Sequence, residues 1–498
     1  MTGSSAEFSL PRATPESQGI ASPVVRQFVE ALENQGNVHS VMLLRHGKVI
    51  AEGWWSPYAR DYPHMLFSVS KSFTSTAVGL AAAEGYLSID DRVLSYFPAE
   101  TSSDPGDPLA AMTVRHLLTM STGHAVDTWP TMVRRPDGDW VAGFLEVPVT
   151  RTPGTHFVYN TGATYMLSAI VQKATGMKLT EFLQPRLFAP LGIENATWRE
   201  SPRGIAHGGT GLSVTTEDIA KFGQLYLQNG LWQGAQIVPE AWVDAATSYQ
   251  VSNGDDANSD WAQGYGYQFW RCRHNAYRGD GAFGQYCIVM PEQDAVLAMT
   301  AGIDLLEMQQ PLDFVWDILL PAMRPDPLPD DGAAQAELSQ KLATVTLPPV
   351  QGQAASPVMT QVSGRTYAVG DNALAIETLT LSFTGDGCVF SIKTATGEET
   401  IPFGYGRWQQ GQPTALFRHP LLFDRTAIAS SGAWTADDVY TMVVQLIETP
   451  FNHTLTCHFV RDELLIEVQV NVSLESTKPV VLLGRSAKQG LNVNASGE

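Results

Sequence analysis

Cysteine is scarce in this sequence. Its 498 residues include only four cysteines, which are Cys272, Cys287, Cys388 and Cys457. They are too few and too scattered for a disulfide framework or for the paired ligand spacing of a zinc site. The sequence also lacks the H-E-x-x-H motif and any dense cluster of His and Asp. We therefore expect buried thiols, no metal and no cofactor.

Basic residues are also in short supply. The chain has 31 Lys and Arg against 51 Asp and Glu, which gives a formal net charge of -20. Such a surplus of carboxylates repels phosphate backbones and anionic membranes unless a basic patch overrides it, and no such patch stands out. The expected partner is a small molecule or a short peptide, with no nucleic acid and no membrane. The composition leaves open whether the protein forms a homo-oligomer.

Long apolar runs are absent as well. No segment reaches membrane-spanning length, and Met1 to Gly19 has no basic region followed by an apolar stretch. These features favour a cytoplasmic protein.

The length favours more than one domain, because a single hydrophobic core stops growing well below 498 residues. The stretches PAMRPDPLPDDG and LPPVQG break both helices and strands. We therefore predict a first domain at residues 1–325, a linker at 326–355 and a second domain at 356–498.

The first domain shows helical patterns between strand patterns. Helical spacing covers residues 24–35, and residues 39–55 form a predicted hairpin with its turn at His46-Gly47. Residues 67–85 predict a buried central helix, and residues 90–239 are mainly helical. Short strands follow between 264 and 300, in GYGYQFW, NAYRGDG, QYCIVM and DAVLAMT. The predicted class is α+β, with an antiparallel sheet flanked by helices and a helical subdomain.

The second domain shows repeated alternation of apolar and polar residues. The pattern occurs in VFSIKTATG, ALFRHPLLF, YTMVVQLIET, LTCHFV, LLIEVQVNV and PVVLLG. A small all-β domain is predicted, either an antiparallel sheet or a barrel.

The first chemical motif is Ser68-Val69-Ser70-Lys71. On a helix, a lysine three residues after a serine lies on the same face, where its amine can take the hydroxyl proton. The spacing alone is weak, since a surface serine with a solvated lysine is the simpler interpretation. Here the motif follows Met65-Leu66-Phe67 and opens an Ala-rich helix. Burial is therefore expected for Lys71, which lowers the pKa of an amine.

The second motif is PGTHFVYNTG, which contains Tyr159. A phenol becomes a usable base only beside a cation, and Lys71 is the candidate cation. A packing tyrosine is the ordinary alternative. No G-x-S-x-G motif is present, so a Ser-His-Asp enzyme is disfavoured, and His64 and His156 are expected to pack or to line a cleft.

The third motif is the glycine-rich segment RGDGAFGQ at residues 278–285. Glycines let a substrate carbonyl approach the main chain, whose N–H groups can then form an oxyanion hole. The segment also matches G-x-G-x-x-G, but a dinucleotide site needs a helix after the glycines, and residues 285–290 are strand-like.

Together these ordered motifs resemble the penicillin-recognising serine enzymes. The surrounding text LFSVSKSFTSTAVGLAAAEGYLSIDD, VRHLLTMSTG and GGTGLSVTTEDIAKFGQLYLQNGLWQG is similar to the class C β-lactamase, esterase, D-aminopeptidase and 6-aminohexanoate-dimer hydrolase branch. The resemblance spans about residues 12–320 and implies a β-lactamase-like fold. The second domain resembles the small lipocalin-like domains that accompany some of these enzymes.

The resemblance implies roles for individual residues. Ser68 would be acylated, Lys71 and Tyr159 would move its proton, and the N–H groups of Ser68 and Ala282 would form the oxyanion hole. Asn160 and Thr161 both qualify for contacting the acyl side chain, and the sequence leaves the choice open.

The strand motif departs from the family pattern K-T-G. Gly279 stands in place of the lysine and Asp280 in place of the threonine, followed by Gly281. These three are the remaining substrate-binding candidates. Without the lysine, efficient β-lactam hydrolysis is not expected, although Arg278 could compensate. An amine-bearing or uncharged substrate is favoured.

The predicted function is hydrolysis of amide or ester bonds through an acyl-enzyme. The substrates would be small molecules or short peptides, including those of D-amino acids. Two alternatives remain: a carboxylesterase with weak β-lactamase activity, and a non-catalytic peptide binder of the penicillin-binding type.

Overall fold

A computed structural model describes residues 9–98, 107–372, 374–414, 416–417 and 426–486. The chain divides into two compact units, with the boundary between Val345 and Thr346. This boundary falls inside the stretch 326–355 that was expected to be a linker. Within that stretch, helix α12 (Gly332–Thr344) packs against helix α1 (Ser22–Gln35), so these residues belong to the first unit.

The first unit is built on a six-stranded antiparallel sheet. Its order is β2 (Lys48–Trp54), β1 (Val38–Arg45), β11 (Ala295–Ala301), β10 (Gln285–Met290), β9 (Tyr277–Gly281) and β8 (Trp270–Arg271). The predicted hairpin is confirmed, because His46 and Gly47 both take the left-handed backbone that its turn requires.

One predicted strand is wrong. Of the segment GYGYQFW, only its last residue, Trp270, is in a strand. Gly264 has φ of 102° and Gln268 has φ of 64°, so the backbone turns twice where an extended strand was expected. Tyr265 makes only isolated bridges, to Val251 and to Trp270.

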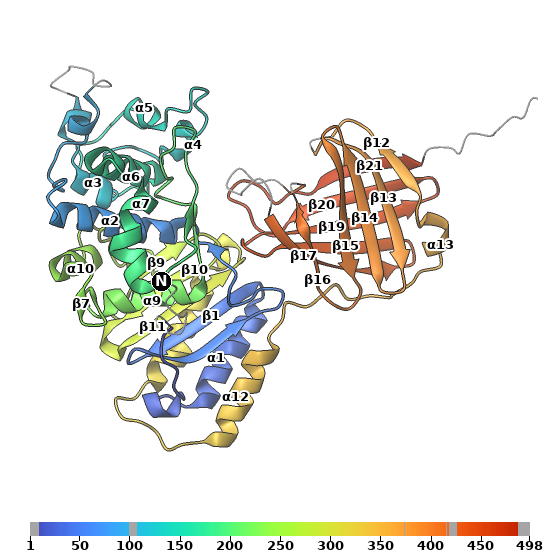
Figure 1. Ribbon diagram of the computed structural model, residues 1–498, viewed down its shortest axis with the longest axis horizontal. Helices are drawn as coiled ribbons and strands as arrows, with labels where there is room; N and C mark the ends of the chain where they lie inside the picture. Colours follow the sequence, from blue (N-terminus) through green and yellow to red (C-terminus); the bar gives the residue numbers. More distant parts are fainter. Residues whose placement is uncertain (1–8, 99–106, 373, 415, 418–425, 487–498) are drawn as a thin grey trace, which may run out of the picture. The chain divides into compact units, whose positions relative to one another are not determined.

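Helices cover both faces of this sheet (Figure 1). Helix α1 and helix α12 lie on one side, against β1 and β2. Helix α9 (Thr216–Leu227) packs against β1, β10 and β11, and helix α2 (Ser70–Ala83) contacts β9. The predicted α+β class is confirmed.

A helical subdomain surrounds α2, in agreement with the helices predicted for residues 90–239. The remaining helices of the first unit are α3 (Val114–Leu118), α4 (Trp129–Met132), α5 (Trp140–Leu145), α6 (Thr161–Thr175), α7 (Leu179–Leu183), α8 (Ala189–Leu191), α10 (Glu240–Thr247) and α11 (Gln309–Phe314). Short strands pair as β3 (His64–Met65), β5 (Leu212–Val214) and β4 (Thr197–Trp198), and as β6 (Leu231–Trp232) with β7 (Ala235–Gln236).

The second unit is a β-barrel, which confirms the all-β prediction and decides between the open sheet and the barrel. Ten strands follow the order β15 (Gly397–Gly404), β14 (Gly387–Thr394), β13 (Ile376–Thr384), β12 (Thr366–Val369), β21 (Val480–Ser486), β20 (Glu463–Val470), β19 (Asn452–Val460), β18 (Val439–Leu446), β17 (Thr426–Ala436) and β16 (Gln409–Thr414). A further pairing of β15 with β17 closes the sheet. Helix α13 (Met359–Val362) precedes β12. Most of the predicted strand ALFRHPLLF lies outside the described residues.

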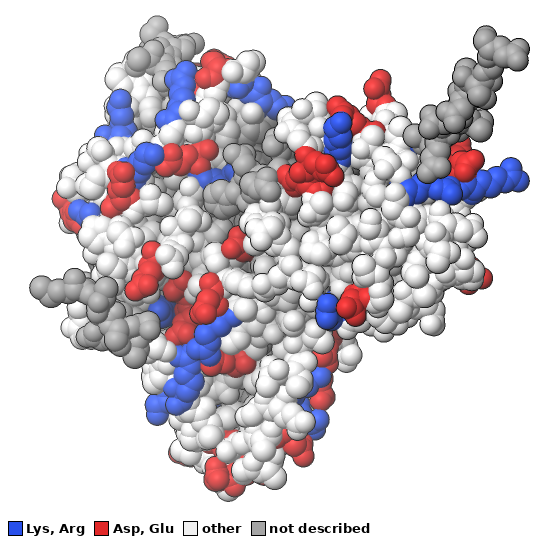
Figure 2. All heavy atoms as spheres, turned by 45° about the vertical axis from the view of Figure 1, so that its right-hand side comes forward, with Lys and Arg blue, Asp and Glu red and all other residues white. Residues whose placement is uncertain are grey.

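The surface carries both charge signs. On the face in Figure 2, Lys and Arg side chains lie among Asp and Glu side chains. Within the described part of the chain, no helix is both long enough and apolar enough to cross a bilayer.

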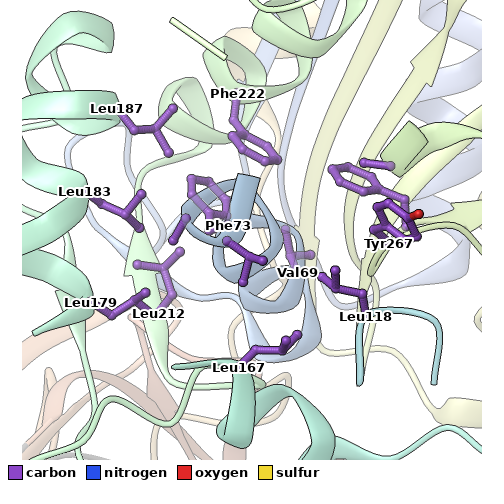
Figure 3. Packing of buried hydrophobic residues seen from close by; sticks show 14 of the residues in the cluster. Val69, Phe73, Leu118, Leu167, Leu179, Leu183, Leu187, Leu212, Phe222 and Tyr267 are labelled. Carbon is purple, nitrogen blue, oxygen red and sulfur yellow. The ribbon is translucent and has the colours of Figure 1, made fainter. Parts of the chain in front are cut away.

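Helix α2 is buried on all sides (Figure 3). Phe73 is fully buried and stacks on Phe222 of α9 at a centroid distance of 3.9 Å. A Cβ added at Gly79 would lie 2.4 Å from the Trp242 ring, so the close approach of α10 requires glycine there. This packing holds α2 rigidly, and with it the side chains at the N-terminus of the helix.

Candidate active site

Ser68 lies at the entrance to helix α2. It occupies the 3-10 turn η2 (Phe67–Val69), which runs directly into the helix, and its side chain is half-buried. Phe67 has φ of 47°, a left-handed conformation that is costly for a residue with a bulky side chain. The chain thus bends sharply just before Ser68.

Lys71 is buried beside Ser68. Its side chain is 1% exposed, and its Nζ donates to Ser68 Oγ at 2.9 Å and to the carbonyl oxygen of Gly209 at 2.8 Å. Burial lowers the pKa of Lys71 to about 7, against the opposing effect of Asp127 and Asp280. Near neutral pH much of Lys71 is therefore a free amine, able to accept the serine proton.

Tyr159 completes this group from the segment before α6. Its hydroxyl hydrogen-bonds with Ser68, and the Lys71 Nζ lies over its ring, 4.8 Å from the centroid. Burial raises the pKa of Tyr159, and the bond to Ser68 offsets only part of that rise. The phenol is therefore neutral, so it can relay a proton but does not serve as a resting phenolate.

The glycine-rich segment meets Ser68 from the sheet. A Cβ on Gly281 would lie only 2.2 Å from the carbonyl oxygen of Leu66, so the end of β9 touches the chain before Ser68. Ala282 follows in the turn to β10. The buried Gln285 side chain donates to the carbonyl oxygens of Ala282 at 3.1 Å and Ala301 at 2.7 Å, which fixes this turn.

The burial of Asn160 argues against its predicted contact with a substrate. It is fully buried, and its Oδ1 accepts from the N–H of Ala163 at 3.3 Å and from the Thr128 hydroxyl at 2.8 Å. Asn160 is thus the N-cap of α6. The next residue, Thr161, is half-buried and has its Oγ1 3.4 Å from the Lys71 Nζ.

Gly279 faces the segment that forms η2 and α2. A Cβ there would lie 3.1 Å from Ser72 Oγ and 3.3 Å from Val69 Cγ1, both on the segment that forms η2 and α2. A side chain at this position would point into the core. Gly279 and Gly281 can offer only main-chain atoms to a substrate, and their predicted role in substrate binding stays a prediction.

Asp280 and Arg278 neutralise each other on the opposite face of β9. The Arg278 Nε donates to Asp280 Oδ2 at 2.7 Å, and the guanidinium lies 4.6 Å from the Trp261 centroid and is fully buried. Burial raises the pKa of Asp280, although Arg278 and Lys71 oppose the shift. Arg278 is thus engaged already and does not compensate for the missing lysine.

His64 packs, as the sequence predicted. Its Nε2 lies 3.0 Å from Nδ1 of the buried His39, and its Nδ1 lies 3.0 Å from the carbonyl oxygen of Met65. His156 is exposed.

No motif in the sequence pointed to Asp127. Its Oδ1 accepts from the N–H of Thr161 at 2.9 Å and of Trp129 at 3.0 Å. Its charge also acts on Lys71 and Tyr159, raising the pKa of both. Asp127 lies in an irregular loop 32 positions before Tyr159, with α4 and α5 between them, so only the fold brings the two together.

Comparisons with known proteins agree with this geometry. A family model described as Beta-lactamase matches residues 25–309. A 6-aminohexanoate-dimer hydrolase of Paenarthrobacter ureafaciens is 27% identical over 278 residues, covering 51% of this chain and 70% of that protein. A D-aminopeptidase of Brucella anthropi is 26% identical over 189 residues, 34% of each chain. The solved structure of EstCE1, a hydrolase with promiscuous acyltransferase activity, superposes with a TM-score of 0.51 at 16% identity, covering 60% of this chain and 98% of that one. That structural likeness concerns the fold.

Proposed function

The chain belongs to the Beta-lactamase family, whose model spans more than half of its residues, and from that premise we propose that Ser68, Lys71 and Tyr159 catalyse the hydrolysis of amide or ester bonds. The family predicted from the motifs is thereby confirmed, and the chain is a serine hydrolase. The observation that carries the proposed roles is the 2.9 Å contact between Lys71 Nζ and Ser68 Oγ, with a Lys71 pKa of about 7.

In the acylation step, Ser68 Oγ attacks the substrate carbonyl carbon while its proton passes to the neutral amine of Lys71. The carbonyl oxygen gains the negative charge, which the N–H groups of Ser68 and Ala282 stabilise. The tetrahedral intermediate then expels the amine or alcohol. The leaving group takes the proton from Lys71, relayed by the Tyr159 hydroxyl.

Deacylation uses the same groups with water as the nucleophile. Water attacks the ester carbonyl on Ser68 and gives its proton to the Lys71–Tyr159 pair. The carboxylic acid leaves, and Ser68 recovers its hydroxyl proton. The cycle therefore consumes one water and leaves the enzyme unchanged.

The proposed substrates are small amides or esters and short peptides, those of D-amino acids included. Two relatives carry names of this kind, a 6-aminohexanoate-dimer hydrolase and a D-aminopeptidase. β-Lactams are disfavoured, because Gly279 supplies no cation and Arg278 is held by Asp280. If the protein only bound its ligand, the largely neutral amine of Lys71 would have no function.

The test is active-site labelling. A fluorophosphonate probe should label the wild type and the Ser75→Ala variant, but not Ser68→Ala. Ser75 is a matched control, since it is buried in the same helix and its Oγ has no hydrogen-bond partner within the described part of the chain. Release of p-nitrophenol from short acyl esters should follow the same order. Labelling of Ser68→Ala, or turnover of nitrocefin much faster than of esters, would overturn the proposal.

We place the protein in the cytoplasm as part of this proposal. Its four cysteines are buried and unpaired, a state that suits a reducing compartment. Neither nucleic acid nor a membrane is a proposed partner, and sedimentation analysis would measure the oligomeric state.

A further inference from the structure

The two carboxylate oxygens of Asp127 differ in their hydrogen bonding. Its Oδ1 accepts from the main-chain N–H of Trp129 at 3.0 Å and of Thr161 at 2.9 Å, which anchors the carboxylate at the start of α6. In the described residues, Oδ2 has no hydrogen-bond partner, and the side chain is only half-buried. A carboxylate held rigidly with one oxygen open is prepared to accept a hydrogen bond from a ligand.

The contacts of Asp127 place its carboxylate near the proposed reaction centre. Thr161 connects the two, because its N–H binds Asp127 while its Oγ1 lies 3.4 Å from the Lys71 Nζ. Both proton-handling residues respond to the charge, since Asp127 raises the pKa of Lys71 and of Tyr159. Asp127 is therefore linked to Ser68 by three contacts that run through Thr161 and Lys71.

No described Lys or Arg forms an ion pair with this carboxylate, and Lys71 acts on its charge only at longer range. Asp280, the other carboxylate that acts on Lys71, is paired with Arg278 at 2.7 Å. By contrast, none of the described Lys or Arg side chains forms an ion pair with Asp127. When a substrate displaces water around Asp127, the unpaired carboxylate loses hydration. A positive charge on the substrate would compensate for that loss by forming an ion pair.

We infer that Asp127 determines specificity by binding a protonated amine on the acyl part of the substrate. This inference rests on the proposed function, since it requires the acyl group to sit on Ser68. The substrate class is then narrowed to amides and esters whose acyl chain carries an ammonium group a few bonds from the carbonyl. Above pH 7 the amine of Lys71 is largely neutral, so it does not repel that ammonium.

The experiment compares two p-nitroanilides that differ in one group. The β-alanyl compound carries an ammonium where the butanoyl compound carries a methyl group. At pH 8 the wild type should prefer the β-alanyl compound in kcat/KM by about 10-fold or more, and Asp127→Asn should remove most of that preference. Any general effect of the variant on Lys71 acts on both substrates and cancels in the ratio.

Asp139→Asn is the matched control. Asp139 caps α5 by accepting from the N–H of Ala142 at 3.0 Å, and it pairs with Arg203. Its variant should keep the wild-type ratio. As a second readout, n-propylammonium should inhibit ester hydrolysis by the wild type more strongly than by Asp127→Asn.

The outcomes separate this inference from the proposed function. If Ser68→Ala is inactive but Asp127→Asn keeps the wild-type preference, the function stands and the inference fails. A preference seen only when the ammonium is on the leaving group would likewise overturn the assignment to the acyl side. An equal loss of activity toward both substrates would leave Asp127 only a structural role at the start of α6.

Discussion

The ring of Phe67 meets the ring of Phe283 edge to face, with centroids 5.1 Å apart and planes at 90°. Phe67 precedes Ser68 and has φ of 47°, while Phe283 follows Ala282 and has φ of 71°. Left-handed backbone costs about 1–2 kcal/mol for such residues. One aromatic contact thus ties together the two strained peptides that flank the proposed oxyanion hole.

This contact predicts a catalytic defect from a substitution in the core. Phe283→Leu removes the edge-to-face contact and should lower kcat for ester hydrolysis by about 10-fold, because the Ala282 N–H loses its fixed direction. The unfolding free energy should fall by about 1–3 kcal/mol. Both quantities follow from steady-state kinetics and urea titration.

Phe144→Leu provides the control. Phe144 is also fully buried in the first unit and packs edge to face on His124 at 4.8 Å. It should lose similar stability while keeping kcat. Equal kcat losses in the two variants would show that stability, and not the Phe67–Phe283 contact, accounts for the effect.

Much of the scaffold was predictable because its information is local. The run of small and apolar residues in α2 and the short apolar runs of β10 and β11 depend on neighbours within a few residues. The pairing of Ser68 with Lys71 is equally local, since one helical turn brings residues three apart together. These parts of the sequence specify their structure without distant contacts.

The rest depends on contacts that no local pattern shows. The choice between Asn160 and Thr161 was undecidable, because it depends on which of them caps α6 against Thr128. Asp127 lies in an irregular loop, and its closeness to Lys71 exists only in the folded chain. Tertiary packing also holds Phe67 in a conformation that its own preferences disfavour.

The pH profile should report Lys71. Because burial lowers the pKa of Lys71 to about 7, kcat/KM for a neutral ester should fall about 10-fold per pH unit below that value. Lys71→Arg should be inactive throughout, since arginine keeps its proton. A wild-type profile that stays flat from pH 5.5 to 8.5 would show that Lys71 is not the base.

Stability should depend on the same group. The pKa of Lys71 falls from 10.5 to about 7 on folding, so between these values the unfolded chain binds a proton that the folded chain lacks. Stability therefore rises with pH in this window, by up to about 1.4 kcal/mol per unit. Urea titrations at pH 7.5 and 9 should show this rise in the wild type relative to Lys71→Met. Parallel behaviour of the two proteins would refute a buried, titrating Lys71.

The Tyr159→Phe variant should have a lower kcat, while the acidic limb of its pH–rate profile should stay in place. Burial raises the pKa of Tyr159, so the phenol relays a proton while Lys71 remains the titrating group. We expect kcat to fall by about 100-fold or more, with the apparent pKa still near 7. Stopped-flow measurement of p-nitrophenol release would locate the loss in acylation or deacylation. An acidic limb displaced by more than a unit would instead make Tyr159 part of the titrating base.

Gly281→Ala tests how closely the sheet must approach Ser68. The added Cβ would lie 2.2 Å from the carbonyl oxygen of Leu66, a main-chain atom that cannot rotate away, so the end of β9 must shift and carry Ala282 with it. Hydrolysis should fall by about 100-fold, the loss typical of a misplaced oxyanion donor. Gly332→Ala is the control, because nothing lies within 4 Å of its added Cβ, and it should keep both activity and unfolding midpoint. If Gly281→Ala retained full activity, Ala282 would not be an oxyanion donor, since a shift of the strand end could not leave such a donor in place.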